Sequence, residues 1–92
     1  MHRIAGLEWD DENRDHIARH GVTSDEVEEV CFSGPLLMKS RKGTRVVYGQ
    51  TLSGRYLFIV IRLFYGGGAR CITARSMTDK ERRFYRKRRP QK

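Results

Sequence analysis

One stretch in the middle of the chain limits the fold more than any other. It is the run RYLFIVIRLF, from Arg55 to Phe64. Successive side chains of a β-strand point to opposite faces of a sheet, and this run is apolar at both its odd and its even positions. A strand with that pattern is covered on each side. The run therefore predicts a central strand rather than an edge strand.

Turn formers on either side of this run predict three more strands. The sequences RKG, SG and GGG favour turns, and they separate the run from strands expected at Leu36–Ser40, Thr44–Leu52 and Ala69–Arg75. Connections this short join antiparallel neighbours, so the sequence predicts a four-stranded antiparallel meander. Ile4–Trp9 is a candidate for one short additional strand at the N-terminal end.

Helix signals occur before and after the strands. An acidic cluster at residues 10–12 suits the positive end of a first helix, expected at about residues 11–20. The sequence TSDE at residues 23–26 has the spacing of a capping box, which begins a second helix. The box recurs as TDKE at residues 78–81 and begins a basic C-terminal helix. The predicted fold class is therefore α+β, with two N-terminal helices, the meander and the C-terminal helix in a single domain of 92 residues.

Charge is distributed unevenly along the chain, whose net charge is +8. Residues 1–38 carry three basic side chains against nine acidic ones, whereas residues 39–92 carry sixteen against two. A cationic surface attracts a polyanion because binding releases condensed counterions. The second half of the chain is therefore expected to bind RNA or another nucleic acid. An anionic membrane surface or an acidic protein would satisfy the same charge.

Export, membrane and metal signals find no support in the sequence. The longest apolar run is far shorter than the roughly 20 residues of a membrane-spanning helix. The N-terminal sequence MHRIAGLEWDD has no apolar core of a signal peptide, so we expect a cytoplasmic protein without a membrane partner. Cys31 and Cys71 lie in apolar runs and are expected in the core. His16 and His20 have helical spacing but no evident third ligand, so we expect neither a metal nor a cofactor.

Several arginines lie within or beside the predicted strands, and acidic residues are scarce in this half of the chain. They are Arg45, Arg55, Arg62, Arg70 and Arg75. A guanidinium presents a planar fork of donors that matches phosphate oxygens, so the set predicts a phosphate-facing surface. Cleavage of RNA without metal also needs a base and an acid. The candidates for these roles are His16, His20, Glu81, Tyr65 and Tyr85. The aromatic side chains of the strands are expected mainly in the core.

Short motifs in order along the chain give it a resemblance to a known family. LEWD at residues 7–10 resembles the family's F-E-W-D, RHGV at residues 19–22 its K-H-G-V, and GRYL at residues 54–57 its G-R-x-L. RCITAR at residues 70–75 resembles R-I-I-S-A-R, and ERRFY at residues 81–85 matches the closing E-R-x-x-Y. The family is that of the BrnT-type toxins, the ribonuclease half of a bacterial type II toxin–antitoxin pair with a RelE-like fold.

The resemblance implies an endoribonuclease that cleaves RNA without metal and arrests growth, neutralised by a ribbon–helix–helix antitoxin that also binds operator DNA. The residues on family motif positions are implied to be catalytic; they are His20, Arg45, Arg55, Thr73, Arg75 and Tyr85. Further cations are expected to bind RNA; they are Arg62, Arg70, Lys80, Arg82, Arg83 and Arg86. Thr73 and Arg75 stand two apart on one strand and so share a face. We expect the reaction centre near Arg75, with Tyr85 beside it.

Two other functions fit the same charge. One is a non-catalytic module that binds nucleic acid. It is favoured by a departure from the family at Thr44, where a glutamate is usual, and a smaller departure occurs at Thr73, where the family has serine. The other is a protein-interaction domain whose basic C-terminal helix docks on an acidic partner. A homodimer is an alternative to a monomer for each of these functions.

Overall fold

The computed structural model describes residues 4–89, which form three helices and a five-stranded sheet. The elements follow the order β1 (Gly6–Glu8), α1 (Asp11–Ala18), α2 (Ser24–Cys31), β2 (Leu36–Lys39), β3 (Thr44–Gln50), β4 (Tyr56–Leu63), β5 (Gly68–Ser76) and α3 (Asp79–Arg88). A short 3₁₀ turn at Arg41–Gly43 joins β2 to β3. Within the described residues, no helix has the length and apolar character needed to cross a membrane.

The strand order is β1-β5-β4-β3-β2, so β4 is central, as its apolar sequence predicts. Strands β2 to β5 form the predicted antiparallel meander. The N-terminal strand β1 adds to it in parallel with β5, so the sheet is mixed and five-stranded rather than four-stranded and antiparallel. The fold class is α+β as predicted, while the RelE-like arrangement implied by the resemblance stays a prediction.

Each helix begins with the hydrogen bonds of a capping box. The Thr23 hydroxyl accepts the backbone N–H of Glu26, and the Glu26 carboxylate accepts that of Thr23. Thr78 and Glu81 make the same pair of bonds at the start of α3. Asp10 begins a box of this kind for α1. These caps satisfy backbone donors that the first helical turn leaves free, which is why short helices start where the sequence indicates.

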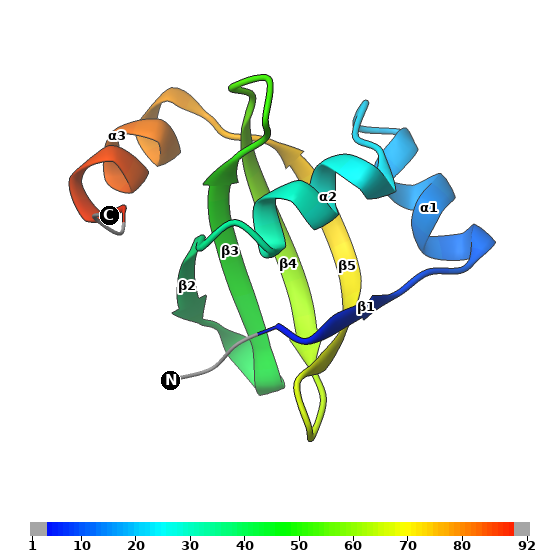
Figure 1. Cartoon of the computed structure of the whole chain (residues 1–92). Helices are drawn as coiled ribbons and strands as arrows, with labels where there is room; N and C mark the ends of the chain where they lie inside the picture. The colour runs from blue at the N-terminus through cyan, green and yellow to red at the C-terminus, as the bar shows by residue number, and fades with distance from the viewer. Residues whose placement is uncertain (1–3, 90–92) are drawn as a thin grey trace.

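The core lies between the sheet and the two N-terminal helices. In Figure 1, α2 crosses in front of the sheet and α1 lies on the β5 side. Leu57, Ile59 and Ile61 of β4 are fully buried on this face. The helices contribute Ile17, Val27, Val30 and Cys31 to the same cluster. Cys71 is also buried there, so the prediction that both cysteines are core residues is confirmed.

The opposite side of the sheet, here called the open face, is only partly covered. Its residues include Val46, Tyr48, Tyr56, Phe58, Val60, Arg62, Thr73 and Arg75. The Phe84 ring of α3 lies 5.2 Å from that of Tyr48, and Figure 1 shows α3 apart from α1 and α2. The expectation that β4 is covered on both sides is therefore only half met.

The aromatic side chains of the strands do not form the core. Tyr48, Tyr56 and Phe58 are half-buried on the open face, and Tyr65 is fully exposed between β4 and β5. The helix-covered face is filled by aliphatic side chains instead, which lets α2 lie close to the strands. The expectation of an aromatic core is wrong, and the aromatic rings are left available to contact the cations of α3.

A candidate RNA-binding and catalytic surface

The strand arginines do not all point the same way. Arg62, Arg70 and Arg75 lie on the open face, as their cross-strand partners show. Arg45 is paired with the buried Ile61 and therefore lies on the helix-covered face, near the start of β3. Residues directly opposite each other on neighbouring strands share a face, so the predicted phosphate-facing surface does not include Arg45.

Arg55 and Arg70 are held by carboxylates of the N-terminal half. Arg55 Nη1 donates to Glu26 Oε1 at 3.1 Å and to Gly21 O at 2.6 Å, which ties the start of β4 to α2. Arg70 Nη1 donates to Asp10 Oδ2 at 2.7 Å, and this hydrogen bond lowers the pKa of Asp10 to about 2. Acidic residues are scarce in residues 39–92, and the carboxylates that pair with Arg55 and Arg70 come from residues 1–38. Both arginines are thus engaged in holding the fold together.

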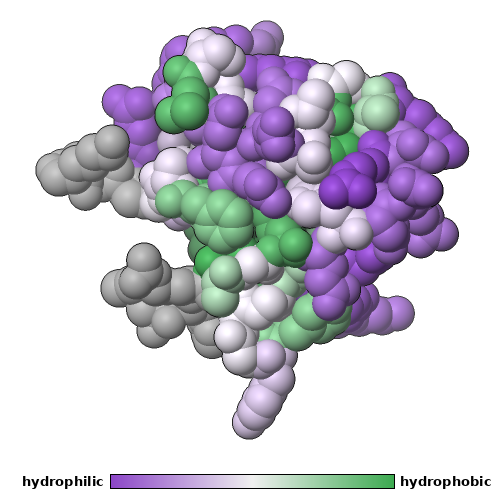
Figure 2. Space-filling model, turned by 45° about the vertical axis from the view of Figure 1, so that its right-hand side comes forward, coloured by the Kyte–Doolittle hydropathy of each residue, from purple (hydrophilic) through white to green (hydrophobic). Residues whose placement is uncertain are grey.

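Thr73 forms a group at the edge of β5 with His16 of α1 and with His20 of the turn that follows α1. His16 Nε2 lies 3.2 Å from Thr73 Oγ1, and the rings of His16 and His20 are 5.6 Å apart. A hollow of about 320 Å³ opens beside His16. Three carboxylates of the same helix are exposed; they are Asp11, Glu12 and Asp15. Glu12 and Arg70 both line the hollow. In Figure 2, the side chains over the upper and right-hand parts of the molecule are mostly hydrophilic. Arg70 is paired with Asp10 and Glu12, and carboxylates repel a polyanion, so this group offers less positive charge to RNA than α3 does.

Arg75 lies near the point where β5 passes into α3. Its Nη1 and Nη2 donate to the two carboxylate oxygens of Glu81 at 2.8 and 2.9 Å. Its guanidinium carbon also lies 4.2 Å from the centre of the Phe58 ring. The hydrogen bonds between Arg75 and Glu81 lower the pKa of Glu81 and raise the pKa of Arg75. The pair therefore stays ionised and fixes the start of α3 against the open face, so Glu81 is a poor proton acceptor.

Tyr56 is surrounded by side chains of α3. Arg86 Nε and Nη2 each donate to Tyr56 Oη at 3.3 Å, and the guanidinium carbon of Arg82 lies 4.5 Å from the centre of the Tyr56 ring. The Tyr85 ring packs edge-on at 6.0 Å. The hydrogen bond from Arg86 is the main reason that the pKa of Tyr56 is lowered. Burial raises the pKa of Tyr85, so Tyr56 is the tyrosine of this pair that loses its proton more readily.

We call this group the Tyr56 cluster. Its members are Tyr56, Arg82, Tyr85 and Arg86, and the Arg75–Glu81 pair holds the start of the same helix. Of the predicted catalytic set it contains Tyr85, which is only 8% exposed and serves as a support for the Tyr56 ring. Lys80 and Arg83 are exposed elsewhere on α3. Sequence patterns did not indicate Tyr56, because the helix that surrounds it lies about 30 residues further along the chain.

The remaining predicted residues lie away from this cluster. Arg45 is paired with Ile61, five residues along β4 from Tyr56, which corresponds to about 17 Å along an extended strand. Arg62 donates to Lys42 O at 2.9 Å at the same end of the sheet. The structure therefore distributes the predicted site over three places, and the Tyr56 cluster is where cations and a tyrosine of lowered pKa meet.

Comparison with known proteins identifies the family. A family model described as the ribonuclease toxin BrnT of a type II toxin–antitoxin system matches residues 9–81, most of the chain. No curated protein and no solved structure matches significantly. The matched segment includes Tyr56, Arg75 and Glu81, whereas Arg82 and Arg86 follow its end. The chain therefore belongs to the BrnT family of ribonuclease toxins of type II toxin–antitoxin systems.

Proposed function

We propose that this chain is a metal-independent endoribonuclease whose reaction takes place at the Tyr56 cluster. The observation that carries the proposal is the contact of Arg86 with the Tyr56 hydroxyl, in a cluster with a second guanidinium over the ring. Cleavage of RNA needs positive charge at the phosphate and a group that takes the proton of the ribose 2′-hydroxyl. The cluster provides both where the cationic helix α3 lies against Tyr56 of β4.

In the proposed reaction, the Tyr56 phenolate takes the proton of a ribose 2′-hydroxyl. The 2′ oxygen forms a bond to phosphorus, and the bond between phosphorus and the 5′ oxygen breaks. The 5′ oxygen takes a proton from water, which leaves a 2′,3′-cyclic phosphate on one fragment and a 5′-hydroxyl on the other. Arg82 and Arg86 stabilise the charge that develops on the phosphate, while Arg75 positions α3 through Glu81.

The partners follow from the same proposal. We expect an antitoxin of the ribbon–helix–helix class, a complex that binds operator DNA, and growth arrest when the toxin is free in the cytoplasm. The cations of α3 that bind RNA in this proposal also suit an acidic segment of the antitoxin, because RNA and such a segment are both negatively charged. Blocking α3 would then be enough to neutralise the toxin.

Incubation of the purified chain with RNA in excess chelator tests the proposal. We expect fragments that end in a 2′,3′-cyclic phosphate, identified by mass spectrometry, because the arginines supply the positive charge. Tyr56→Phe, purified in parallel, excludes a contaminating nuclease if it leaves the RNA intact. Cleavage that occurs only after magnesium is added back would contradict metal independence. RNA that stays intact with and without magnesium would contradict the proposed nuclease activity.

Arg86→Ala is expected to move the pH dependence of cleavage to higher pH. The hydrogen bond from Arg86 lowers the pKa of Tyr56, so the phenolate forms at a lower pH than the value of about 10 usual for tyrosine. Without Arg86 the pKa of Tyr56 rises, and each unit of that rise removes about nine-tenths of the phenolate at neutral pH. The measurement is kcat as a function of pH. Arg83→Ala removes the same charge from an exposed site of α3, and it should not move the midpoint of the pH profile. Equal midpoints for the wild type and Arg86→Ala would rule out Tyr56 as the proton acceptor.

A further inference from the structure

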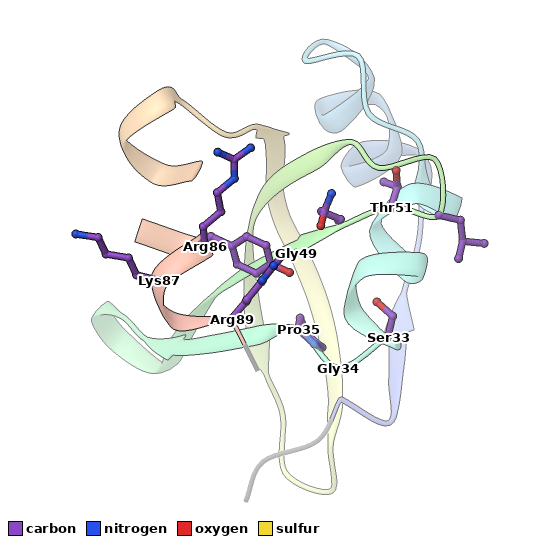
Figure 3. A pocket seen from close by; sticks show the side chains of 11 residues that line it. Ser33, Gly34, Pro35, Gly49, Thr51, Arg86, Lys87 and Arg89 are labelled. Carbon is purple, nitrogen blue, oxygen red and sulfur yellow. The ribbon is translucent and has the colours of Figure 1, made fainter. Parts of the chain in front are cut away.

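A pocket of about 700 Å³ lies next to the Tyr56 cluster. Three segments line it: residues 33–35 before β2, residues 49–52 at the end of β3, and residues 85–87 together with Arg89 at the end of α3 (Figure 3). Arg86 and Tyr85 belong both to this lining and to the Tyr56 cluster. The pocket and the proposed reaction centre are therefore two parts of one surface.

Hydrogen bonds hold one wall of the pocket in place. The backbone N–H of Leu52 donates to Glu29 Oε1 at 2.9 Å, and the backbone N–H of Arg55 donates to Thr51 Oγ1 at 3.0 Å. The turn after β3 is thus fixed to α2 while the Leu52 side chain stays 87% exposed. Leu52 and Pro35, both in the lining, offer apolar surface for a flat ring to pack against.

The opposite wall supplies positive charge. Arg86, Lys87 and Arg89 line the pocket, and no acidic side chain of residues 4–89 belongs to the lining. In Figure 3 the Lys87 side chain points outward, whereas the Arg89 side chain extends toward the middle of the lining residues. Guanidinium groups match phosphate oxygens in geometry as well as in charge. One wall of the pocket thus suits a phosphate, and the other suits a base.

We infer that this pocket is a subsite for one nucleotide of the RNA strand, next to the two nucleotides that are joined by the phosphate cut at Tyr56. Its base packs on Leu52 and Pro35, and its phosphate binds Arg89. The volume falls within the range of about 300–1,000 Å³ typical of ligand sites. The inference rests on the proposed function, because the Tyr56 cluster defines the bond that is cut. A subsite in this pocket would make cleavage more efficient for a substrate long enough to reach it.

The test compares variants of the two walls with a matched control. The probe is a fluorescent 2′-O-methyl hexanucleotide, which has no free 2′-hydroxyl and is not cut; its affinity is measured by anisotropy at several salt concentrations. We expect Arg89→Ala to weaken binding about tenfold. The slope of log affinity against log salt concentration should fall by the amount that corresponds to about one lost phosphate contact. Leu52→Ala is expected to weaken binding about threefold without changing the salt dependence, because it removes apolar contact and no charge.

The control is Arg41→Ala, which removes one positive charge before β3, at the strand end opposite to the pocket. Screening limits its effect on binding to about twofold. In cleavage assays, Arg89→Ala and Leu52→Ala should lower kcat/KM for a hexaribonucleotide and leave kcat/KM for a diribonucleotide at the wild-type value. Thermal melts verify that each variant is folded.

Two results would overturn the subsite. One is equal hexanucleotide affinity for Arg89→Ala, Leu52→Ala and Arg41→Ala. The other is a loss of antitoxin binding by the pocket variants with unchanged hexanucleotide affinity, which would assign the pocket to the partner protein. A failure of the proposed nuclease is distinguishable from both results. The wild type would then bind the hexanucleotide and cut no RNA, while the affinities of the variants would still decide whether the pocket binds a nucleotide.

Discussion

Tyr56→Phe is expected to reduce RNA cleavage by a factor of about 10²–10⁴, the range of a lost proton-transfer group. The substitution removes the hydroxyl that accepts two hydrogen bonds from Arg86 and keeps the ring that Arg82 and Tyr85 contact. RNA affinity should therefore change little while kcat falls. Single-turnover cleavage of a defined oligoribonucleotide, with binding measured separately on a non-cleavable analogue, distinguishes these two effects.

Tyr65→Phe is the matched control for this result. It makes the same chemical change at a fully exposed tyrosine between β4 and β5, and it should cut RNA at the wild-type rate. Both variants should melt at nearly the wild-type temperature, because neither loses buried apolar surface. Wild-type cleavage by Tyr56→Phe would show that the hydroxyl takes no part, and the reaction centre would have to be sought at His16 and Thr73 instead.

Gly49→Ala should destabilise the fold by about 1–3 kcal/mol, the usual cost of forcing extra volume into a packed core. A Cβ at this position would lie 2.7 Å from Val30 Cγ1, and both residues are buried between β3 and α2. Urea unfolding followed by circular dichroism measures the change. The expected result is a lower midpoint with little change in the slope.

A double variant shows whether the clash is the cause. Val30→Ala removes the methyl group that a new Cβ would meet, so Gly49→Ala should cost less in that background than in the wild type. Gly6→Ala is a useful reference, since nothing lies within 4 Å of a Cβ built there. Strictly additive effects of Gly49→Ala and Val30→Ala would show that the tight contact with α2 is not what requires glycine.

Local patterns were enough to locate most elements of this fold. The capping boxes at Thr23 and Thr78 depend on side chains three residues apart, and the central position of β4 follows from its own apolar sequence. The pairing of β1 with β5 joins Gly6 to Gly68, and no local pattern specifies such a contact. The parallel strand was therefore recognisable as a strand but not as a neighbour of β5.

The site was harder to predict for the same physical reason. Arg70 was identified as a cation, but its partner Asp10 lies sixty residues away, so its engagement in an ion pair could not be inferred. Tyr56 has an ordinary position in a strand, and its lowered pKa depends on Arg86, thirty residues further on. Composition indicated a cationic surface, whereas the identity of a reactive group depended on which cations the fold brings to which ring.

The stacking of arginines on aromatic rings has a consequence for the helix that carries them. Like charges four residues apart repel along α3, as between Arg82 and Arg86, and such pairs destabilise a helix. The rings of Tyr56 and Phe84, which contact arginines of α3, offset part of this repulsion. An RNA strand or an acidic partner would remove much of what remains. By thermodynamic linkage, we expect the bound toxin to resist heat better than the free one and the free toxin to be the form more exposed to proteolysis.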